Sequence, residues 1–443
     1  MRYYVPSTER EQRAMLQEAS FSEFGDLYKN IPENLRIDCL DIPSGSSELG
    51  VRRVIERLAA KNKIYRSIFR GAGAYNHYIP SLVRQITSRE EFMTSYTPYQ
   101  AEISQGILQA IFEFQTMMCE LTGLDASNAS VYDGASAAAE AAAMCREKRR
   151  TRVLVSETAN PRAAAVMRTY AHAAGVECLT VPACEGVTGL EKLSGMIDDT
   201  VSCVYVESPN YFGLIEDAAA LADTAHAGGA KFVMGVNPIA AAIFKTPAEC
   251  GADVAVGEGQ PLGMPLSFGG PYLGFMTAAA EMTRKLPGRI VGETVDAEGN
   301  RAFVLTMQAR EQHIRREKAS SNVCSNQALC ALTASVYLTV MGPDGLREVA
   351  SQCHSKAFYA AERISAIPGF ELVYGGEIFH EFVTRCPGDS SGVLGELDER
   401  GILGGLPADL KTGGNCLLWC VTEMNTSDEI DELVSVLKEA AGR

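Results

Sequence analysis

Several features that define other classes of protein are missing from this sequence of 443 residues. No stretch approaches the ~20 consecutive apolar residues that a membrane-spanning helix needs, so we predict no membrane partner. The first ten residues carry charges and a proline where a secretion signal would need an apolar stretch. We therefore expect a soluble protein of the cytoplasm.

Positive charge and metal-binding motifs are also scarce. The 40 lysines and arginines stand against 55 aspartates and glutamates, and the net charge of -15 argues against a nucleic-acid partner. The thirteen cysteines include no C-x-x-C pair, and single histidines such as His77 and His354 lack the spacing of a zinc motif. We expect no metal site, and we expect buried thiols in a reducing compartment.

The N-terminal region has short helical patterns but little that predicts a core. Thr8 and Glu11 have the spacing of a helix-capping box, and prolines and glycines interrupt the patterns that follow. We expect residues 1–75 to form a helical arm.

The central region alternates between strand and helix patterns. After a long amphipathic helix at residues 102–121, helical stretches such as 162–174 and 215–227 separate most of the short apolar runs. Such crossover connections predict a mainly parallel sheet covered on both faces, in a large α/β domain of residues 76–340. The predicted strands are 152–155, 176–181, 201–206, 232–236, 253–256 and 272–276.

A third region follows. A helical pattern at residues 326–341 breaks at Gly342-Pro343-Asp344-Gly345, and Thr426 and Glu429 form another capping box before a last helix at 428–441. We predict a small C-terminal α/β domain of residues 341–443.

One segment concentrates polar groups where a loop enters a helix. Tyr96-Thr97-Pro98-Tyr99-Gln100-Ala101-Glu102 holds two phenols, a hydroxyl, an amide and a carboxylate. Tyrosine can bind a carboxylate or stack on a ring, and glutamine or glutamate can hold an amine. A capped helix with half-buried tyrosines explains the same residues, and both alternatives stay open.

Two other segments have a functional and an ordinary explanation. Gly134–Ser136 opens an alanine-rich helix and could bind an anion, but an ordinary helix start is the explanation we favour. Residues 308–318 concentrate cationic groups that could clamp an anion. A solvated helix face with pairs such as Glu311–Arg315 explains them as well, and we prefer it slightly.

A lysine is missing from residues 252–261, a segment that otherwise has the pattern of the anchoring end of a pyridoxal-phosphate enzyme. That cofactor is normally tethered through a lysine imine, and the amide of Gln260 cannot replace the amine. Nor does Asn237, at a strand end, supply the charge that an aspartate would give the ring nitrogen. The sequence indicates that the lysine of its active site lies elsewhere.

Three motifs carry a resemblance to a known family. They are residues 96–106, then Val256-Gly257-Glu258-Gly259-Gln260 with Phe268-Gly269-Gly270-Pro271, then residues 311–327. Over essentially its whole length the chain resembles the glycine-cleavage P-protein, glycine dehydrogenase (decarboxylating), and within it the N-terminal half that many prokaryotes make as a separate subunit 1 (alpha). Ser320 and Ser325 stand where threonines would be expected, and a hydroxyl is kept at both places.

The resemblance implies a pyridoxal-phosphate-dependent transferase fold of the aminotransferase type (fold type I). It also implies a partner, subunit 2 (beta), that supplies the Schiff-base lysine and binds pyridoxal 5'-phosphate, with no covalent cofactor on this chain. In the family's reaction, glycine loses carbon dioxide and its aminomethyl group passes to the lipoyl arm of the H-protein. An alpha2-beta2 heterotetramer is expected.

The resemblance also implies roles for single residues. Tyr96 and Tyr99 are expected to be catalytic and to reach across the subunit interface to the glycine–cofactor adduct. The residues expected to support them in substrate binding are Thr97, Gln100, Glu102, Ser320 and Asn322.

Two other functions compete with this one. The chain could be a non-catalytic scaffold or regulatory subunit of the same complex. It could also be an independent enzyme that uses another lysine, of which Lys245 lies nearest in sequence to the anchor segment, although before strand 253–256 rather than after it.

Overall fold

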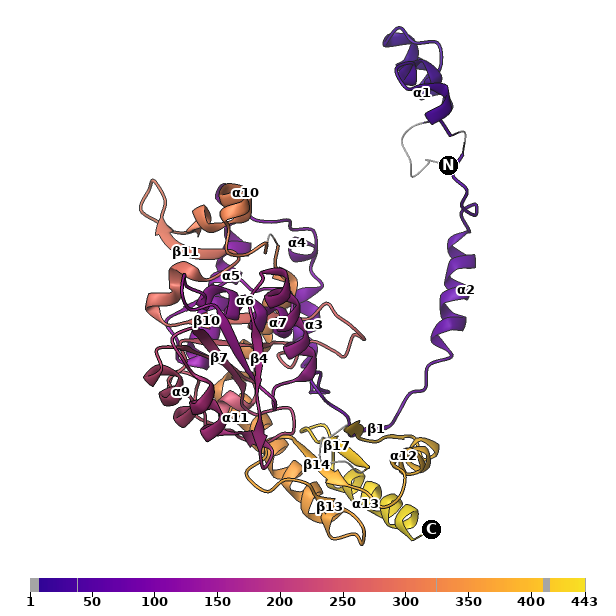
Figure 1. Cartoon of the computed structure of the whole chain (residues 1–443). Helices are drawn as coiled ribbons and strands as arrows, with labels where there is room; N and C mark the ends of the chain where they lie inside the picture. Colours follow the sequence, from indigo (N-terminus) through magenta and orange to yellow (C-terminus); the bar gives the residue numbers. More distant parts are fainter. Residues whose placement is uncertain (1–7, 38, 324, 409–414, 443) are drawn as a thin grey trace. The chain divides into compact units, whose positions relative to one another are not determined.

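A computed structural model describes residues 8–37, 39–323, 325–408 and 415–442. The chain separates into two units, Met1–Ile64 and Tyr65–Arg443. Figure 1 shows the elements of each. A three-part division at residues 75 and 340 stays a prediction.

The first unit is helical and has almost no interior. The helix α1 begins with the predicted capping box, in which Thr8 and Glu11 bond each other's backbone. Among the described residues of this unit, Leu16 alone is buried. Val54 and Leu58 lie on an exposed apolar side of α2. The elements are α1 (Glu9–Glu18), η1 (Phe24–Tyr28), η2 (Glu33–Leu35) and α2 (Glu48–Ala59).

A seven-stranded sheet dominates the second unit. Its five strands from β9 to β4 run parallel, whereas β10 and β2 pair antiparallel at one edge. The order is β2 (Ala126–Ser127), β10 (Gly274–Ala278), β9 (Val254–Glu258), β8 (Lys231–Gly235), β7 (Val201–Glu207), β3 (Arg152–Ser156) and β4 (Cys178–Val181). The prediction of a mainly parallel sheet is confirmed.

Side chains of the parallel strands alternate between two cores. Val153 and Val155 of β3 pack with α6 (Gly134–Cys145) and α7 (Pro161–Ala173), whereas Leu154 packs with α9 (Ala218–Ala227). Because successive strand residues point to opposite faces, each face needs a layer of helices. Helices thus cover both faces, as predicted (Figure 1). A further short helix, α8 (Leu190–Met196), packs beside α9.

The tyrosine segment at residues 96–102 and a two-stranded hairpin lie against α5 (Gln105–Thr122). The predicted helix starts three residues later than expected, because residues Ala101–Ile103 form a separate 3-10 turn, η3. A two-stranded hairpin of β11 (Ile290–Val295) and β12 (Arg301–Thr306) packs on α5 through Phe303.

A long helix links the large sheet to a smaller one. α11 (Ala328–Ser365) changes direction at Gly342, whose φ of 63° and ψ of 179° are not helical, as the predicted break requires. Its second half packs beneath the antiparallel sheet β13 (Glu371–Leu372), β14 (Glu381–Arg385), β17 (Cys416–Cys420) and β16 (Leu406–Ala408). Trp419, the one tryptophan of the chain, is buried there.

Two helices cover the small sheet. They are α12 (Ser390–Glu399) and α13 (Ser427–Ala441), and the predicted capping box of Thr426 and Glu429 begins α13. The remaining elements are β1 (Ser67–Ile68), β15 (Ile402–Leu403), α3 (Ser81–Thr87), α4 (Glu90–Met93), β5 (Ala183–Cys184), β6 (Val187–Thr188), η4 (Ala240–Ala242), η5 (Ala280–Lys285), η6 (Gln308–Arg310), α10 (Gln312–Arg315) and η7 (Arg316–Lys318).

Two expectations drawn from composition need comment. Most described cysteines are buried, but Cys39 and Cys184 are exposed. α11 is long and apolar enough to cross a membrane by length and composition, yet it turns at Gly342 and contributes buried residues to two cores of the second unit. The simpler explanation is that it is a core helix of the fold.

Candidate active site

The predicted tyrosine segment lies on the surface between α4 and α5. Tyr96 is 86% exposed and Tyr99 is 54% exposed, so the alternative of half-buried tyrosines is wrong for Tyr96. Gln100 and Glu102 are exposed as well, and Thr97 is half-buried. The segment presents its polar groups outward, toward whatever covers this surface.

Tyr99 has a partner that the sequence did not indicate. The Arg289 guanidinium donates from Nη2 to the Tyr99 hydroxyl at 2.9 Å, and its central carbon lies 5.3 Å from the centre of the phenol ring. A guanidinium beside an aromatic ring is attracted to its electron-rich face, and the hydrogen bond adds a fixed direction. Arg289 therefore holds Tyr99 in one orientation.

Residues 128–130 connect the loop around Arg289 to the third resemblance motif. The Ala129 N–H donates to the Arg289 carbonyl at 2.8 Å, and Asn326 donates to both Ala129 and Ser130 at 3.2 Å. Ser320 and Asn322 are exposed on the segment just before Asn326. The structure thus brings the motifs at 96–106 and 311–327 to one loop, although its described residues include no hydrogen bond from Ser320 or Asn322 to either tyrosine.

The cationic segment at 308–318 is largely solvated, in line with the explanation we favoured. It forms only short turns, and the helix α10 has a single turn. The predicted pair Glu311–Arg315 is wrong: the Glu311 carboxylate lies 3.4 Å from His313 Nδ1, and the Arg315 side chain donates to the Ala309 carbonyl. The turn is too short to present a regular helix face.

Gln260, in the segment that lacks a lysine, is built into the interior. It is 1% exposed, and its amide oxygen accepts from the Tyr75 N–H at 2.9 Å. Its amide nitrogen donates to the carbonyls of Tyr75 at 2.9 Å and Met264 at 2.8 Å. Since a buried polar group must be bonded, this amide locks the anchor loop onto the chain near residue 75.

Carboxylates occupy the start of α6. Glu258, the last residue of β9, accepts from the backbone N–H groups of Gly134 (3.0 Å), Leu273 (2.8 Å) and Gln260 (3.0 Å), and Asp133 accepts from Ser136 (2.7 Å). Burial raises the pKa of Glu258 to about 7. The start of this helix is an ordinary cap, as we favoured, with Asp133 as the capping residue and Glu258 on the Gly134 N–H.

The groups around Gln260 and Glu258 do not fit pyridoxal phosphate held by this chain. Asn237 uses its amide oxygen to cap the turn at Ile239 and lies 3.2 Å from His380, so it offers no charge to a ring nitrogen. Gln260 is no nucleophile, and Glu258 takes the N–H of Gly134 that a phosphate would need. None of these three positions offers the cofactor the group that it would use there.

Lys245, the alternative anchor, lies apart from that loop. It is exposed and lines a cavity of about 250 Å³ whose other walls include Glu216, Asp217 and Cys250. Gln260 is not among the residues lining this cavity. The structure therefore gives Lys245 no link to the anchor segment.

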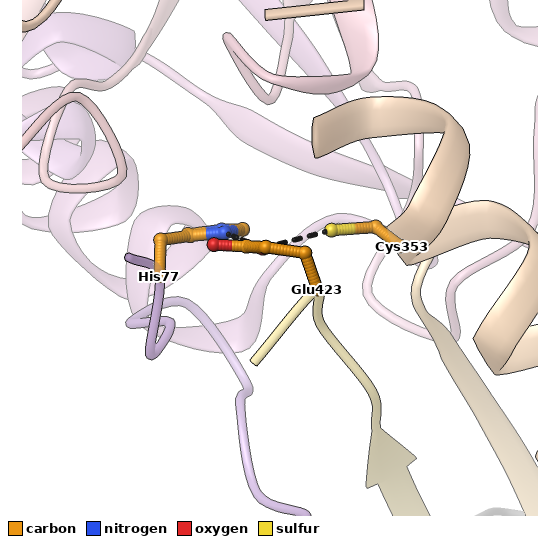
Figure 2. Close-up of side chains that lie close together, drawn as sticks. All are labelled: His77, Cys353 and Glu423. Atoms are coloured by element: carbon orange, nitrogen blue, oxygen red, sulfur yellow. Dashed lines mark hydrogen bonds and ion pairs between the residues drawn. The ribbon is translucent and has the colours of Figure 1, made fainter. Parts of the chain in front are cut away.

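A buried cluster joins three distant parts of the second unit. Figure 2 shows His77, Cys353 and Glu423 pointing toward one another. The Glu423 carboxylate lies 2.7 Å from His77 Nδ1 and accepts from the Cys353 thiol at 3.3 Å, and it also accepts from the Tyr78 N–H at 2.6 Å. Sequence spacing could not reveal this cluster, because Glu423 lies 70 residues from Cys353 and 346 from His77.

The same three residue types can hold a metal ion, and their donor atoms lie within 4.8 Å of one another. However, burial and the nearby Glu423 carboxylate raise the pKa of the Cys353 thiol well above its ordinary value, so the thiol stays protonated and donates. The hydrogen bond from His77 keeps the pKa of Glu423 low in spite of its burial. We interpret the cluster as a hydrogen-bond network, although His77 Nε2 is buried and has no partner among the described residues.

The arrangement of sheets and helices defines the class of protein. The sheet, the helix layers and the small C-terminal sheet are those of a pyridoxal-phosphate-dependent transferase of fold type I. Solved structures of a sphingosine-1-phosphate lyase from Burkholderia pseudomallei (15% identity, TM-score 0.68, covering 93% of this chain and 94% of that one) and of a NifS-like protein from Rickettsia africae (12%, 0.63, 86% and 100%) share the fold.

The chain belongs to the glycine cleavage system P-protein family, whose model matches residues 2–437. It is 50% identical over 442 residues to the probable glycine dehydrogenase (decarboxylating) subunit 1 of Moorella thermoacetica, covering 98% of this chain and 99% of that one. The corresponding protein of Thermomicrobium roseum is 46% identical over 444 residues, covering 99% of each. A crystal structure of glycine decarboxylase (P-protein) in an inhibitor-bound form has a TM-score of 0.94 at 41% identity, and covers 99% of this chain and all of that one. The resemblance found in the sequence is confirmed.

Proposed function

We propose that this chain is a catalytic alpha subunit that contributes side chains to an active site whose cofactor is bound by subunit 2. The family gives the reaction, glycine decarboxylation, and the names of the relatives imply a second subunit. The observation that supports the proposal most directly is Gln260, a buried and fully bonded amide at the place of the lysine.

The exposed tyrosines support the same proposal from the other side. Tyr96 is highly exposed, although an aromatic side chain of this size gains ~2 kcal/mol when it is buried. Across an interface, its hydroxyl and that of Tyr99 would hydrogen-bond the carboxylate of glycine bound at the partner's cofactor, with Thr97, Gln100 and Glu102 around them. Ser320 and Asn322 would complete the rim of this site.

Pyridoxal phosphate supplies the electron-accepting ring for decarboxylation when it is bound. This chain's part is then to orient glycine and to keep water away from it. We propose that the aminomethyl product leaves on the lipoyl arm of the H-protein, that the assembly is an alpha2-beta2 heterotetramer, and that it works in the cytoplasm.

The first test uses the purified chain with pyridoxal phosphate. Alone, it should develop no imine absorption band and no glycine–bicarbonate exchange activity, and both should arise when subunit 2 is added. Exchange activity of this chain in the absence of subunit 2 would disprove the proposal.

The second test separates a catalytic role from a scaffold. Tyr96→Phe removes one hydroxyl from an exposed side chain, so the assembly should form normally while exchange activity falls by about tenfold or more. Tyr78→Phe, which alters another exposed tyrosine, is the matched control and should keep full activity. A Tyr96, Tyr99 and Glu102 triple variant with normal kinetics would favour the scaffold.

A third test addresses Lys245. Borohydride reduction of the active complex, followed by peptide mapping, should place the cofactor on a lysine of subunit 2. A labelled Lys245 peptide would instead identify an independent enzyme.

A further inference from the structure

Two arginines flank the hairpin on the side of the chain that holds Tyr99: Arg289 bonds the Tyr99 hydroxyl, and Arg310 bonds the backbone beside Arg289. Arg289 precedes β11 and is 4% exposed, and Arg310 follows β12 and is half-buried. Arg310 donates from Nη2 to the Gly288 carbonyl at 3.0 Å and from Nε to Met307 at 2.9 Å. These bonds hold the Arg310 side chain against Gly288, the residue before Arg289.

Neither Arg289 nor Arg310 makes an ion pair in the described part of the chain. The Glu311 carboxylate acts on Arg310 electrostatically and raises its pKa, so Arg289 is the arginine without a nearby negative charge there. Burial still lowers the pKa of Arg310 overall. Burying an unpaired cation is costly, so the arrangement favours an anion nearby.

Each arginine also keeps a donor without a partner. Arg289 Nε and Arg310 Nη1 are buried and have no hydrogen-bond acceptor among the residues that the structure describes. Buried N–H groups are bonded in the great majority of folded proteins, so these two donors are available to a further acceptor.

The bond to Arg289 fixes what the Tyr99 hydroxyl can do. A guanidinium only donates, so the phenol oxygen must accept from it. The single proton of the hydroxyl is then free to be donated elsewhere, and the side chain is 54% exposed. Tyr99 is therefore set up as an outward donor with a positive charge behind it.

We propose that Tyr99, Arg289 and Arg310 form a binding site for an oxyanion of the ligand, either a carboxylate or a phosphate group. Tyr99 makes the direct contact. Arg289 acts through it as a positioning residue, and Arg310 adds to the positive potential. The site deepens the proposed function, on which it rests, because it names the chemical group that the tyrosine segment recognises.

The test uses the complex with subunit 2 and the variants Arg289→Met, Arg289→Lys and Tyr99→Phe. Arg289→Met should weaken binding of the oxyanion-bearing ligand by about tenfold or more, as loss of a charge-assisted bond does. Arg289→Lys keeps the charge and should restore most of the binding. The double variant Arg289→Met with Tyr99→Phe should be little worse than the worse single variant, because the arginine acts through the tyrosine.

Two measurements distinguish the source of the oxyanion. A raised KM for glycine with an unchanged Kd for pyridoxal phosphate identifies the substrate carboxylate, and the reverse result identifies the cofactor phosphate. Arg301→Met is the matched control, because Arg301 lies on the same hairpin, over the ring of Phe303, and is paired with Glu293. It should leave both constants within twofold of the wild type.

Stability of the isolated chain separates binding from a structural role. Since Arg289 has no ion pair there, Arg289→Met should leave the urea midpoint unchanged or raise it. A lowered midpoint with unchanged KM and Kd would overturn the oxyanion site, as would unchanged binding constants alone. The proposed function fails separately, if Tyr96→Phe keeps full exchange activity while Arg289→Met still raises KM or Kd.

Discussion

Replacing Gln260 by alanine tests whether the hydrogen bonds of this side chain stabilise the fold. The wild-type amide makes three hydrogen bonds, to the Tyr75 N–H, the Tyr75 carbonyl and the Met264 carbonyl. At about 1 kcal/mol for each bond, alanine should lower the free energy of unfolding by about 3 kcal/mol, and the unbonded groups left behind add to the loss.

The assay is urea unfolding of the isolated chain, followed by fluorescence of Trp419. That residue is the one tryptophan and is buried in the second unit, so its signal reports on the unit that contains Gln260. The slope of the free energy against urea should not change, because the native fold is kept. Gln109→Ala, on the exposed side of α5, is the control and should change the stability by less than about 0.5 kcal/mol.

The expected result for Gln260→Lys sharpens the same reasoning. The lysine cannot accept from the Tyr75 N–H, and Glu258 still holds the start of α6, so this variant should unfold more easily and develop no imine absorption with pyridoxal phosphate. A loss below about 1 kcal/mol in Gln260→Ala, or a cofactor band in Gln260→Lys, would refute the idea of a lock.

Three more predictions concern stability. Burial raises the pKa of Glu381 from 4.5 to about 7, so the folded state favours the protonated carboxyl and loses stability as the pH rises through that range. In urea unfolding at pH 5 and pH 8, the wild type should therefore lose about 3 kcal/mol that the variant Glu381→Gln keeps. The hydrogen bond from His77 lowers the pKa of Glu423 below 4.5, so stability should fall as the medium becomes more acidic than pH 4.5; Glu423→Gln, which cannot lose a charge, should lack that part of the acid transition. Gly213 has a φ of +87° and a Cβ there would lie 1.8 Å from the Glu381 carbonyl oxygen, so Gly213→Ala should cost more than about 3 kcal/mol and show a clearly lower Tm in calorimetry.

Local signals made most of the fold predictable. The capping boxes at Thr8 and Thr426 appear at the starts of α1 and α13, and the apolar runs become the parallel strands within one or two residues. The break at Gly342 was visible because a glycine followed directly by a proline disfavours a continuous helix. The antiparallel pairing of β10 was not predicted, because strand direction depends on the path of the connecting loop.

The candidate site was predictable only in its sequence-local parts. The motif of Tyr96 and Tyr99 and the missing lysine could be found by inspection. The bond from Arg289 to Tyr99 joins residues 190 positions apart, and that from Gln260 to Tyr75 joins residues 185 apart. Such contacts are made by the folded chain and leave no periodic pattern in the sequence. The catalytic roles of the two tyrosines stay predictions.

The carboxylate of Glu258 has an evolutionary consequence. Regaining an independent cofactor site would require a lysine at 260 and loss of the acid at 258. If the lysine at 260 came first, Glu258 would still accept the N–H at the start of α6. If Glu258 were lost first, the backbone N–H groups of Gly134, Leu273 and Gln260 would lose their hydrogen-bond acceptor. Either order therefore begins with a harmful step, so the division of labour that we propose between two polypeptides would be hard to reverse one mutation at a time.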